Sequence, residues 1–242
     1  MKKSLEICFV DLAGLPYAHD TLENGTVGGS EAAIFNLVQT FSALNHNVTV
    51  FNDCLEEGKF NDVVWLHTSK ISTIKKEFDV VIASRQVDSC NPHSDSFVKG
   101  KVKILWLHDY FLQGYADDDT HAEGLELIAT YLTKNWIDYV FTLSDWHTHY
   151  LLQNMATESF NGHGLYKNKI IQTRNGFRPW PQEDTRKDRN KFVYFSNVGR
   201  GLHQLLENWS TIKLSIPHAN LHVIGGSYTS DTEKNRWLIH YK

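Results

Sequence analysis

Features that mark several classes of protein are scarce in this sequence of 242 residues. The three cysteines lack metal-ligand spacing, which disfavours both a disulfide framework and a cysteine metal site. The formal net charge of −4 leaves no basic excess for binding nucleic acid. No apolar run approaches membrane-spanning length, and no small-residue cleavage site follows the amino terminus. We therefore expect a soluble, cytoplasmic protein with reduced thiols, no transmembrane segment and no nucleic-acid partner.

Short apolar segments alternate with amphipathic ones, which is typical of a parallel sheet flanked by helices. Strands are expected over 7–10, 48–51, 63–67, 78–84, 101–109, 139–144, 170–177, 192–196 and 221–224. Helices are expected over 31–41, 125–133, 145–152 and 202–209, with another beginning within 231–241. The pattern predicts an α/β fold made of doubly wound, Rossmann-like units.

A change of composition predicts the domain organisation. The segment 179–190 contains Pro179, Pro181 and a run of charged residues, which is typical of a linker. We expect a complete amino-terminal domain over 1–178 and an incomplete second domain over 191–242. Because so short an α/β piece cannot cover both faces of its sheet, it should be marginal unless it packs on the first domain or on another chain.

A glycine loop precedes the first expected helix. Gly28 and Gly29 allow the backbone to turn and to approach a ligand closely, and Ser30 is expected to cap a helix that Glu31 begins. Such a loop suits an anion. Glycine pairs before helices also serve tight packing alone, so both interpretations stay open. The loop is neither the G-x-G-x-x-G of dinucleotide binders nor a P-loop.

Polar residues gather where strands are expected to end. His108 and Asp109 close the strand over 101–109, and Arg85 follows the strand over 78–84. Strand carboxyl ends are where the chemistry of such sheets is found. A hydrogen-bonded structural histidine and a salt-bridged arginine are the alternatives at these positions. The acidic run 117–119 is expected to form a solvated turn in a loop.

Six short motifs, in this order, resemble those of the retaining GT-B glycosyltransferases of family 4, which move a sugar from a nucleotide sugar to an acceptor. They are Gly28-Gly29-Ser30-Glu31, Trp106-Leu107-His108-Asp109, Leu143-Ser144-Asp145-Trp146-His147, Arg174-Asn175-Gly176-Phe177, the segment 194–206 with Ser196, Arg200, Gly201 and Leu202, and the segment 221–226. Each motif is short, but their order and spacing extend over nearly the whole chain.

The resemblance implies roles for particular residues. It places His108 and Asp109 at the catalytic centre, beside the transferred sugar. It implies a donor site, for diphosphate and sugar, at Gly28, Gly29, Ser30, Ser196, Arg200, Gly201, Gly225 and Gly226. It implies an acceptor side at Arg85, Ser144, Trp146, Arg174 and Asn175. The family generally works without a catalytic metal, so neither a metal nor a cofactor is expected beyond the nucleotide sugar that serves as substrate.

The chain departs from the family pattern in its second domain. The family carries a paired-glutamate E-x7-E motif there, together with the pocket for base and ribose. After Gly226 this sequence has Glu233 as its last glutamate, so it cannot supply that motif. We therefore expect a donor domain that is truncated here or completed by a second chain.

Two hypotheses follow from the resemblance. The chain is a glycosyltransferase, or part of one, whose partners are a nucleotide-sugar donor and a glycan or other sugar acceptor. Alternatively, it is a non-catalytic module, derived from the acceptor domain, that binds a glycan or a protein. An enzyme that uses a dinucleotide is disfavoured because the glycine fingerprint is absent.

Overall fold

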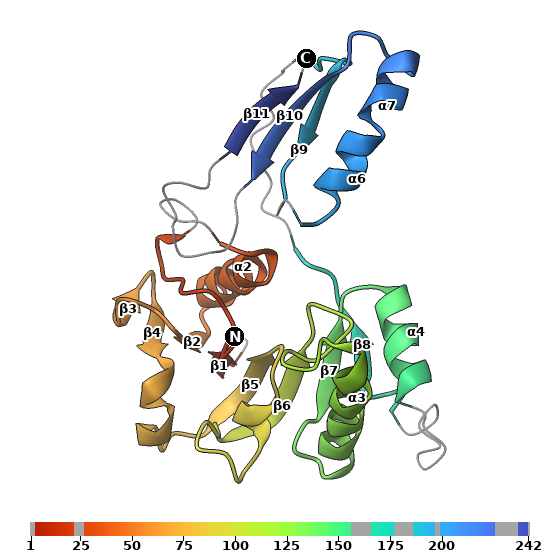
Figure 1. Cartoon of the computed structure of the whole chain (residues 1–242). Helices are drawn as coiled ribbons and strands as arrows, with labels where there is room; N and C mark the ends of the chain where they lie inside the picture. The colour runs from red at the N-terminus through yellow and green to blue at the C-terminus, as the bar shows by residue number, and fades with distance from the viewer. Residues whose placement is uncertain are drawn as a thin grey trace. The chain divides into compact units, whose positions relative to one another are not determined.

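The computed structural model describes residues 3–21, 27–155, 166–176, 186–196, 199–225 and 237–241. The chain divides into two compact units, Met1–Pro179 and Trp180–Lys242, each built around its own sheet (Figure 1). The linker expected over 179–190 falls partly outside the described residues, which resume at Arg186.

An eight-stranded sheet organises the first unit. From edge to edge its strands are β3 (Gly58–Phe60), β4 (Val63–His67), β2 (Asn47–Asn52), β1 (Glu6–Val10), β5 (Phe78–Ser84), β6 (Gly100–Trp106), β7 (Tyr139–Thr142) and β8 (Ile170–Gln172). Neighbouring strands are parallel except the edge pair β3 and β4. From the central β1 the chain first builds β2 and β4 on one side, and later β5 to β8 on the other. The direction of winding therefore switches between β1 and β5.

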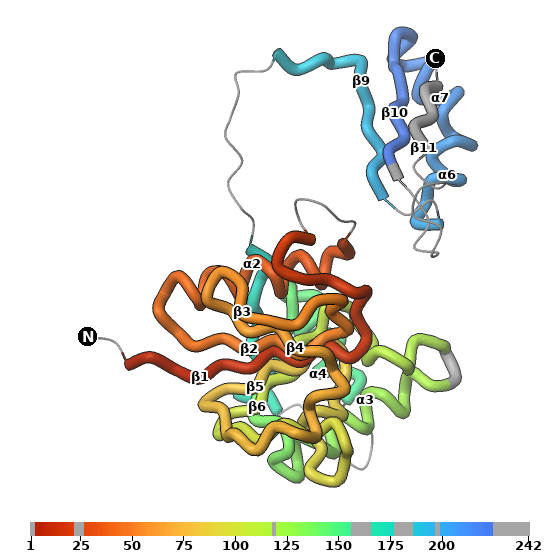
Figure 2. Tube along the Cα trace, turned by 90° about the vertical axis from the view of Figure 1, so that its left-hand side faces the viewer, coloured from red at the N-terminus to blue at the C-terminus, as the bar shows by residue number. Residues whose placement is uncertain are grey.

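Helices lie on both sides of this sheet, as Figures 1 and 2 show; they are α2 (Gly29–Ala43), α3 (Asp118–Thr133) and α4 (Asp145–Asn154), with the short 3-10 helices η1 (Thr68–Thr73) and η2 (Asp88–Cys90). Side chains alternate between the two faces of a strand, so neighbours on β6 join different cores. Trp106 packs in the cluster that contains Ile34 of α2, whereas Leu105 packs with Ile128 of α3 and Leu151 of α4. The expected Rossmann-like arrangement is thus present.

The second unit is a β-α-β piece with one added strand. Its elements are β9 (Lys191–Tyr194), α6 (Leu202–Glu207), α7 (Trp209–Ser215), β10 (Asn220–Gly225) and β11 (Trp237–Tyr241). β9 and β10 pair in parallel, as a helical crossover requires, and β11 pairs antiparallel with the other edge of β10. Leu202, Trp209, Leu221 and Val223 form its small buried core.

Three of the expected elements were wrong in detail. The segment expected to begin a helix within 231–241 contains β11, because its branched and aromatic residues suit an edge position beside β10. The acidic run is not a loop turn, because Asp117 is the N-cap and Asp118 the first residue of α3. The helix over 202–209 is interrupted at Asn208, which separates α6 from α7.

Candidate functional site

The carboxyl ends of β1 and β5 lie where the winding of the sheet switches direction. Ligands of open α/β sheets bind in the crevice at such a point. Asp11 follows β1, Arg85 follows β5, and Glu31 lies in the first turn of α2. The side chains of these three residues meet here.

Arg85 joins two buried carboxylates. Its Nη2 donates to Asp11 Oδ1 and Oδ2 at 3.1 and 3.3 Å, and to Glu31 Oε1 at 2.7 Å. The exposed side-chain fraction is 0% for Asp11, 4% for Glu31 and 12% for Arg85. Burial raises the pKa of Asp11, although the Arg85 charge opposes this shift. Burial also acts against the charge on Arg85, but the two carboxylates outweigh it and raise the pKa of the guanidinium. One cation, the Arg85 guanidinium, therefore compensates the charges of both buried carboxylates.

The backbone of Arg85 is held in a left-handed conformation, with φ of 61°. For a residue with a side chain this conformation is unfavourable by about 1–2 kcal/mol. The surrounding chain secures it, because Arg85 N donates to Trp106 O and Arg85 O accepts from Gln113 N, both at 3.0 Å. The sequence suggested an acceptor-side role for Arg85, and its Nη2 is already engaged within this ion network.

The glycine loop is shaped by Glu31. The prediction that Ser30 caps the helix was wrong, because α2 begins at Gly29, its N-cap is Gly28, and no side chain caps it. Instead, the Glu31 carboxylate folds back over the loop: a Cβ atom on Gly28 would lie 2.2 Å from Glu31 Oε2. The other carboxylate oxygen is bound by Arg85, so the space above Gly28 is already filled.

Substituting Gly28 with alanine should therefore destabilise the protein, by about 1–2 kcal/mol, because the added methyl group forces Glu31 to leave a buried charge-assisted hydrogen bond. The matched control is Gly29→Ala, since a Cβ there meets nothing within 4 Å. Alanine is also the better helix former, so this control should be neutral or stabilising. Urea denaturation of both variants measures the difference, and equal stability of the two would contradict the packing argument.

His108 and Asp109 lie in the loop after β6, not on the strand as predicted. The strand ends at Trp106, because pairing with β7 runs out after the backbone bond from Leu107 N to Phe141 O at 3.0 Å. The His108 ring lies against Trp106, with centroids 4.4 Å apart. Both of its ring nitrogens are buried and have no hydrogen-bond partner among the described residues.

Burial, together with the nearby Arg85 charge, lowers the pKa of His108 to about 4. The imidazole is therefore neutral near neutral pH and can both donate and accept a hydrogen bond. His147, on the buried side of α4, has its pKa lowered by burial, and the Asp109 charge acts in the opposite direction. The loop after β6 and the start of α4 thus share one electrostatic environment.

The start of α4 positions two residues expected on the acceptor side. Ser144 is the N-cap, and its Oγ accepts from His147 N at 3.1 Å. Trp146 points outward and is 62% exposed. Arg174 and Asn175 follow β8 and are exposed. These four residues therefore follow the carboxyl ends of β7 and β8, at the same edge of the sheet as His108.

The second unit carries the other expected donor residues. Arg200 is exposed, and its backbone oxygen accepts from Tyr194 Oη at 3.0 Å. Gly201, at φ of 96°, is the N-cap of α6, a conformation that suits glycine. Ser196 follows β9 closely, Gly225 ends β10, and Gly226 lies outside the described residues. The carboxyl ends of the parallel strands β9 and β10 thus carry these residues: Ser196 and Arg200 follow β9, and Gly225 is the last residue of β10.

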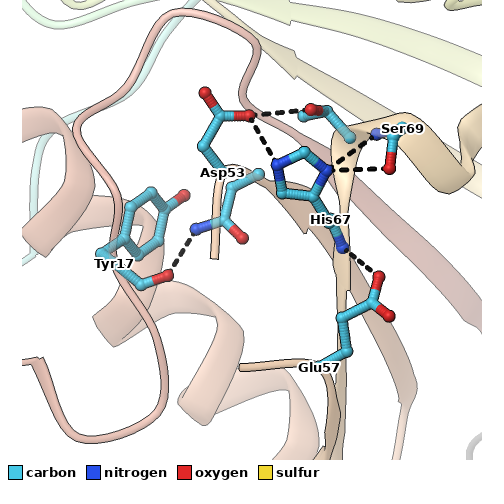
Figure 3. A network of polar contacts seen from close by, with 7 residues as sticks. Tyr17, Asp53, Glu57, His67 and Ser69 are labelled. Atoms are coloured by element: carbon cyan, nitrogen blue, oxygen red, sulfur yellow. Dashed lines mark hydrogen bonds and ion pairs between the residues drawn. The ribbon is translucent and has the colours of Figure 1, made fainter. Parts of the chain in front are cut away.

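A second polar network lies on the other side of the switch point, at the ends of β2 and β4 (Figure 3). Asn52 Nδ2 donates to Tyr17 O at 2.6 Å, which fastens the loop after β1. His67 Nε2 lies 3.7 Å from Asp53 Oδ1, and its backbone N donates to Glu57 Oε1 at 2.9 Å. These contacts hold loops together, and they explain the polar residues here without a ligand.

A cavity of about 840 Å³ lies along α2. It is lined by α2 residues such as Leu37 and Phe41, by Trp106 and Phe141 of the sheet, and by Thr173 and Arg174 after β8, among others. Neither the glycine loop nor His108 lines it. We place the candidate site at the switch point and the strand ends, because the buried charges and unpartnered polar atoms gather there.

Sequence reasoning missed several residues of this site. Asp11 is the second acid of the ion network, and its position directly after a buried strand was an available signal. Glu31 was assigned only to the helix end, although its carboxylate is bound to Arg85. Tyr110 and Tyr150 pack around Trp146, and no sequence motif linked them to it.

Among the residues that the structure describes, no group of three or more His, Cys, Asp or Glu side chains is placed to hold a metal ion. None of the helices described is both long and apolar enough to cross a membrane.

No family model and no curated protein matches the sequence. Among solved structures, the chain is similar to Anabaena Alr3699/HepE in complex with UDP and glucose, at 14% identity and a TM-score of 0.58, over 95% of this chain and 63% of that one. It also matches the glycotransferase of kitacinnamycin, at 10% identity and a TM-score of 0.43, over 96% of this chain and 69% of that one. This chain therefore spans 63% of the length of the HepE structure, and it shares a Rossmann-like α/β fold with that protein.

Proposed function

We propose that this chain is part of a retaining glycosyltransferase of family 4, which transfers a sugar from a nucleotide sugar to a glycan or other acceptor. The observation that carries the proposal is the similarity of its fold, across 95% of the chain, to a protein whose structure holds UDP and glucose. The order of the sequence motifs agrees with it. The chain spans 63% of the length of that protein.

In this reaction the bond between the anomeric carbon of the donor sugar and the diphosphate oxygen breaks. An acceptor hydroxyl oxygen forms a new bond to the same carbon with retained configuration, and its proton goes to the departing diphosphate. Negative charge grows on the diphosphate as the bond breaks, so a fixed cation and backbone N–H groups stabilise the transition state.

The described residues suit these tasks. In the second unit, Arg200 is an exposed cation after the carboxyl end of β9, able to pair with a diphosphate. In the first unit, the start of α2 at Gly29 offers helix N–H groups beside open space, whereas Glu31 fills the space above Gly28. His108 is a neutral imidazole with two unpartnered nitrogens, able to hydrogen-bond a sugar hydroxyl. We assign Arg85 to positioning, because its contacts to Asp11 and Glu31 hold the glycine loop.

Calorimetric titration of the chain with UDP, GDP and their sugar conjugates tests the proposal. Binding is expected, and Arg200→Ala should weaken it about tenfold or more, because a charge-assisted hydrogen bond to phosphate is lost. The matched control is Arg189→Ala: Arg189 is exposed in the same unit but precedes β9, at the opposite strand end. The control should bind as the unaltered chain does.

Failure to bind any of these nucleotides would overturn the donor role. Binding of a glycan without binding of nucleotides would instead assign the chain to the alternative class, the non-catalytic glycan-binding modules. Equal weakening by Arg189→Ala and Arg200→Ala would show that general charge, and not a site at Arg200, attracts the diphosphate.

A further inference from the structure

Aromatic side chains gather on the surface beside His108 and Asp109. Trp146 stacks on Tyr150, with ring centroids 5.2 Å apart and an angle of 23° between the rings. Tyr110 stands edge-on to both, with centroids 6.3 Å from Trp146 and 5.4 Å from Tyr150. We call these three residues, with His121, the aromatic platform.

The platform is open to solvent but internally ordered. Trp146 is 62% exposed and Tyr110 44% exposed. Tyr150 Oη and His121 Nε2 are hydrogen-bonded at 2.8 Å, which fixes the ring beneath Trp146. Large aromatic side chains are more often buried, so a preorganised and exposed cluster of them indicates a binding surface.

The platform adjoins the proposed catalytic centre. Tyr110 directly follows Asp109 in the loop after β6, and Trp146 directly precedes His147 at the start of α4. The charges of this region interact across the two segments, since Asp109 acts on the pKa of His147 and His147 on that of His108. A ligand that lies on the platform would therefore extend toward His108.

The two segments that supply the platform carry only acidic charges. The segments 104–133 and 139–155, which supply its four residues, contain no lysine or arginine. Their acidic residues are Asp109, Asp117, Asp118, Asp119, Glu123, Glu126 and Asp145. An anionic ligand, such as a uronic acid or a phosphorylated sugar, would meet repulsion from this side.

We propose that the aromatic platform binds a neutral pyranose ring of the acceptor, stacked on Trp146. This inference rests on the proposed function and deepens it by naming the acceptor class. The C–H groups on one face of a pyranose meet the negative face of an aromatic ring, while its hydroxyl groups reach carboxylates and phenol oxygens at the rim. A protein partner is disfavoured, because a stable interface needs about 20–30 residues on each side and the platform offers a few rings.

Saturation-transfer NMR on the full chain with cellobiose tests the inference. Cellobiouronic acid, in which a carboxylate replaces one hydroxymethyl group, is the charged counterpart. Cellobiose should bind with a millimolar Kd and cellobiouronic acid more weakly. Trp146→Ala should weaken cellobiose binding about tenfold, as expected for a lost stacking contact, while Trp146→Phe retains most of it.

A matched control is available for the second ring. Tyr110→Ala should weaken cellobiose binding severalfold, whereas Tyr139→Ala should leave it unchanged, because Tyr139 is 37% exposed but begins β7 at the opposite edge of the sheet. The inference is overturned if cellobiose does not bind, if Trp146→Ala binds it equally well, or if the uronic acid binds more tightly. Titrating the same samples with UDP distinguishes the two proposals, since Trp146→Ala should leave UDP binding intact and a failure with UDP concerns the donor role alone.

Discussion

Replacing Arg85 with leucine should lower the free energy of unfolding by about 3–5 kcal/mol. The substitution leaves the Asp11 and Glu31 carboxylates buried and close together without a cation, and both were bound by the same guanidinium nitrogen. Desolvated charges without a partner are strongly unfavourable, so the loss exceeds the energy of the hydrogen bonds themselves. Because this network also holds the glycine loop, nucleotide-sugar binding by the variant should weaken as well.

The pH dependence of the variant distinguishes this cause from simple loss of packing. In Arg85→Leu the pKa of folded Asp11 rises further above its unfolded value, so the folded state takes up a proton first as pH falls. The variant should therefore regain part of its stability on acidification. Urea denaturation across the acid range measures this recovery. The control Lys101→Met, which breaks an exposed ion pair with Asp79, should change stability far less. A loss below about 1 kcal/mol in Arg85→Leu, with no recovery in acid, would contradict the ion-network argument.

Elements with a strong local pattern were predictable from the sequence. β4 and β5 occupy 63–67 and 78–84 as expected, because continuous branched and apolar runs between polar residues specify strands buried in a parallel sheet. The cap of α4 is likewise local, since the Ser144 hydroxyl needs only a backbone N–H three residues away. The expected α/β fold class was confirmed because most of its helices and strands are specified by residues within the element itself.

Features that depend on distant segments were not predictable. Arg85 is separated by 74 residues from Asp11 and by 54 from Glu31, so only the order of strands in the sheet brings them together. That contact also explains the error at Ser30, because the Glu31 side chain fills the space over the loop. The strand β11 was missed because its own sequence lacks a clear strand periodicity. Pairing with the free edge of β10 selects its conformation instead. The local sequence pattern thus locates the strand ends at which a site lies. Contacts between distant segments determine which side chains there are already hydrogen-bonded or ion-paired.

The imidazole of His108 should make the protein lose stability in acid. Its pKa is about 4 in the folded chain, against about 6.5 when unfolded. As pH falls through about 6.5, the unfolded state binds a proton that the folded state does not, so folding weakens until pH reaches about 4, below which the loss levels off. Between about pH 7.5 and 4.5 the expected loss from this group is about 2.5 kcal/mol.

Comparison with His108→Gln isolates this contribution from the other titrating groups, among them Asp11, whose raised pKa acts in the opposite direction. The variant should lack the loss of about 2.5 kcal/mol, so its stability relative to the unaltered chain improves by that amount on acidification. The control His149→Gln removes an exposed imidazole from α4 and should follow the unaltered chain. Urea midpoints at the two pH values provide the measurement, and parallel profiles for His108→Gln and the unaltered chain would show that His108 titrates normally.

A neutral His108 at physiological pH is what the proposed reaction requires, because a cation beside Arg85 would be repelled by it, whereas a neutral ring remains free to hydrogen-bond the transferred sugar.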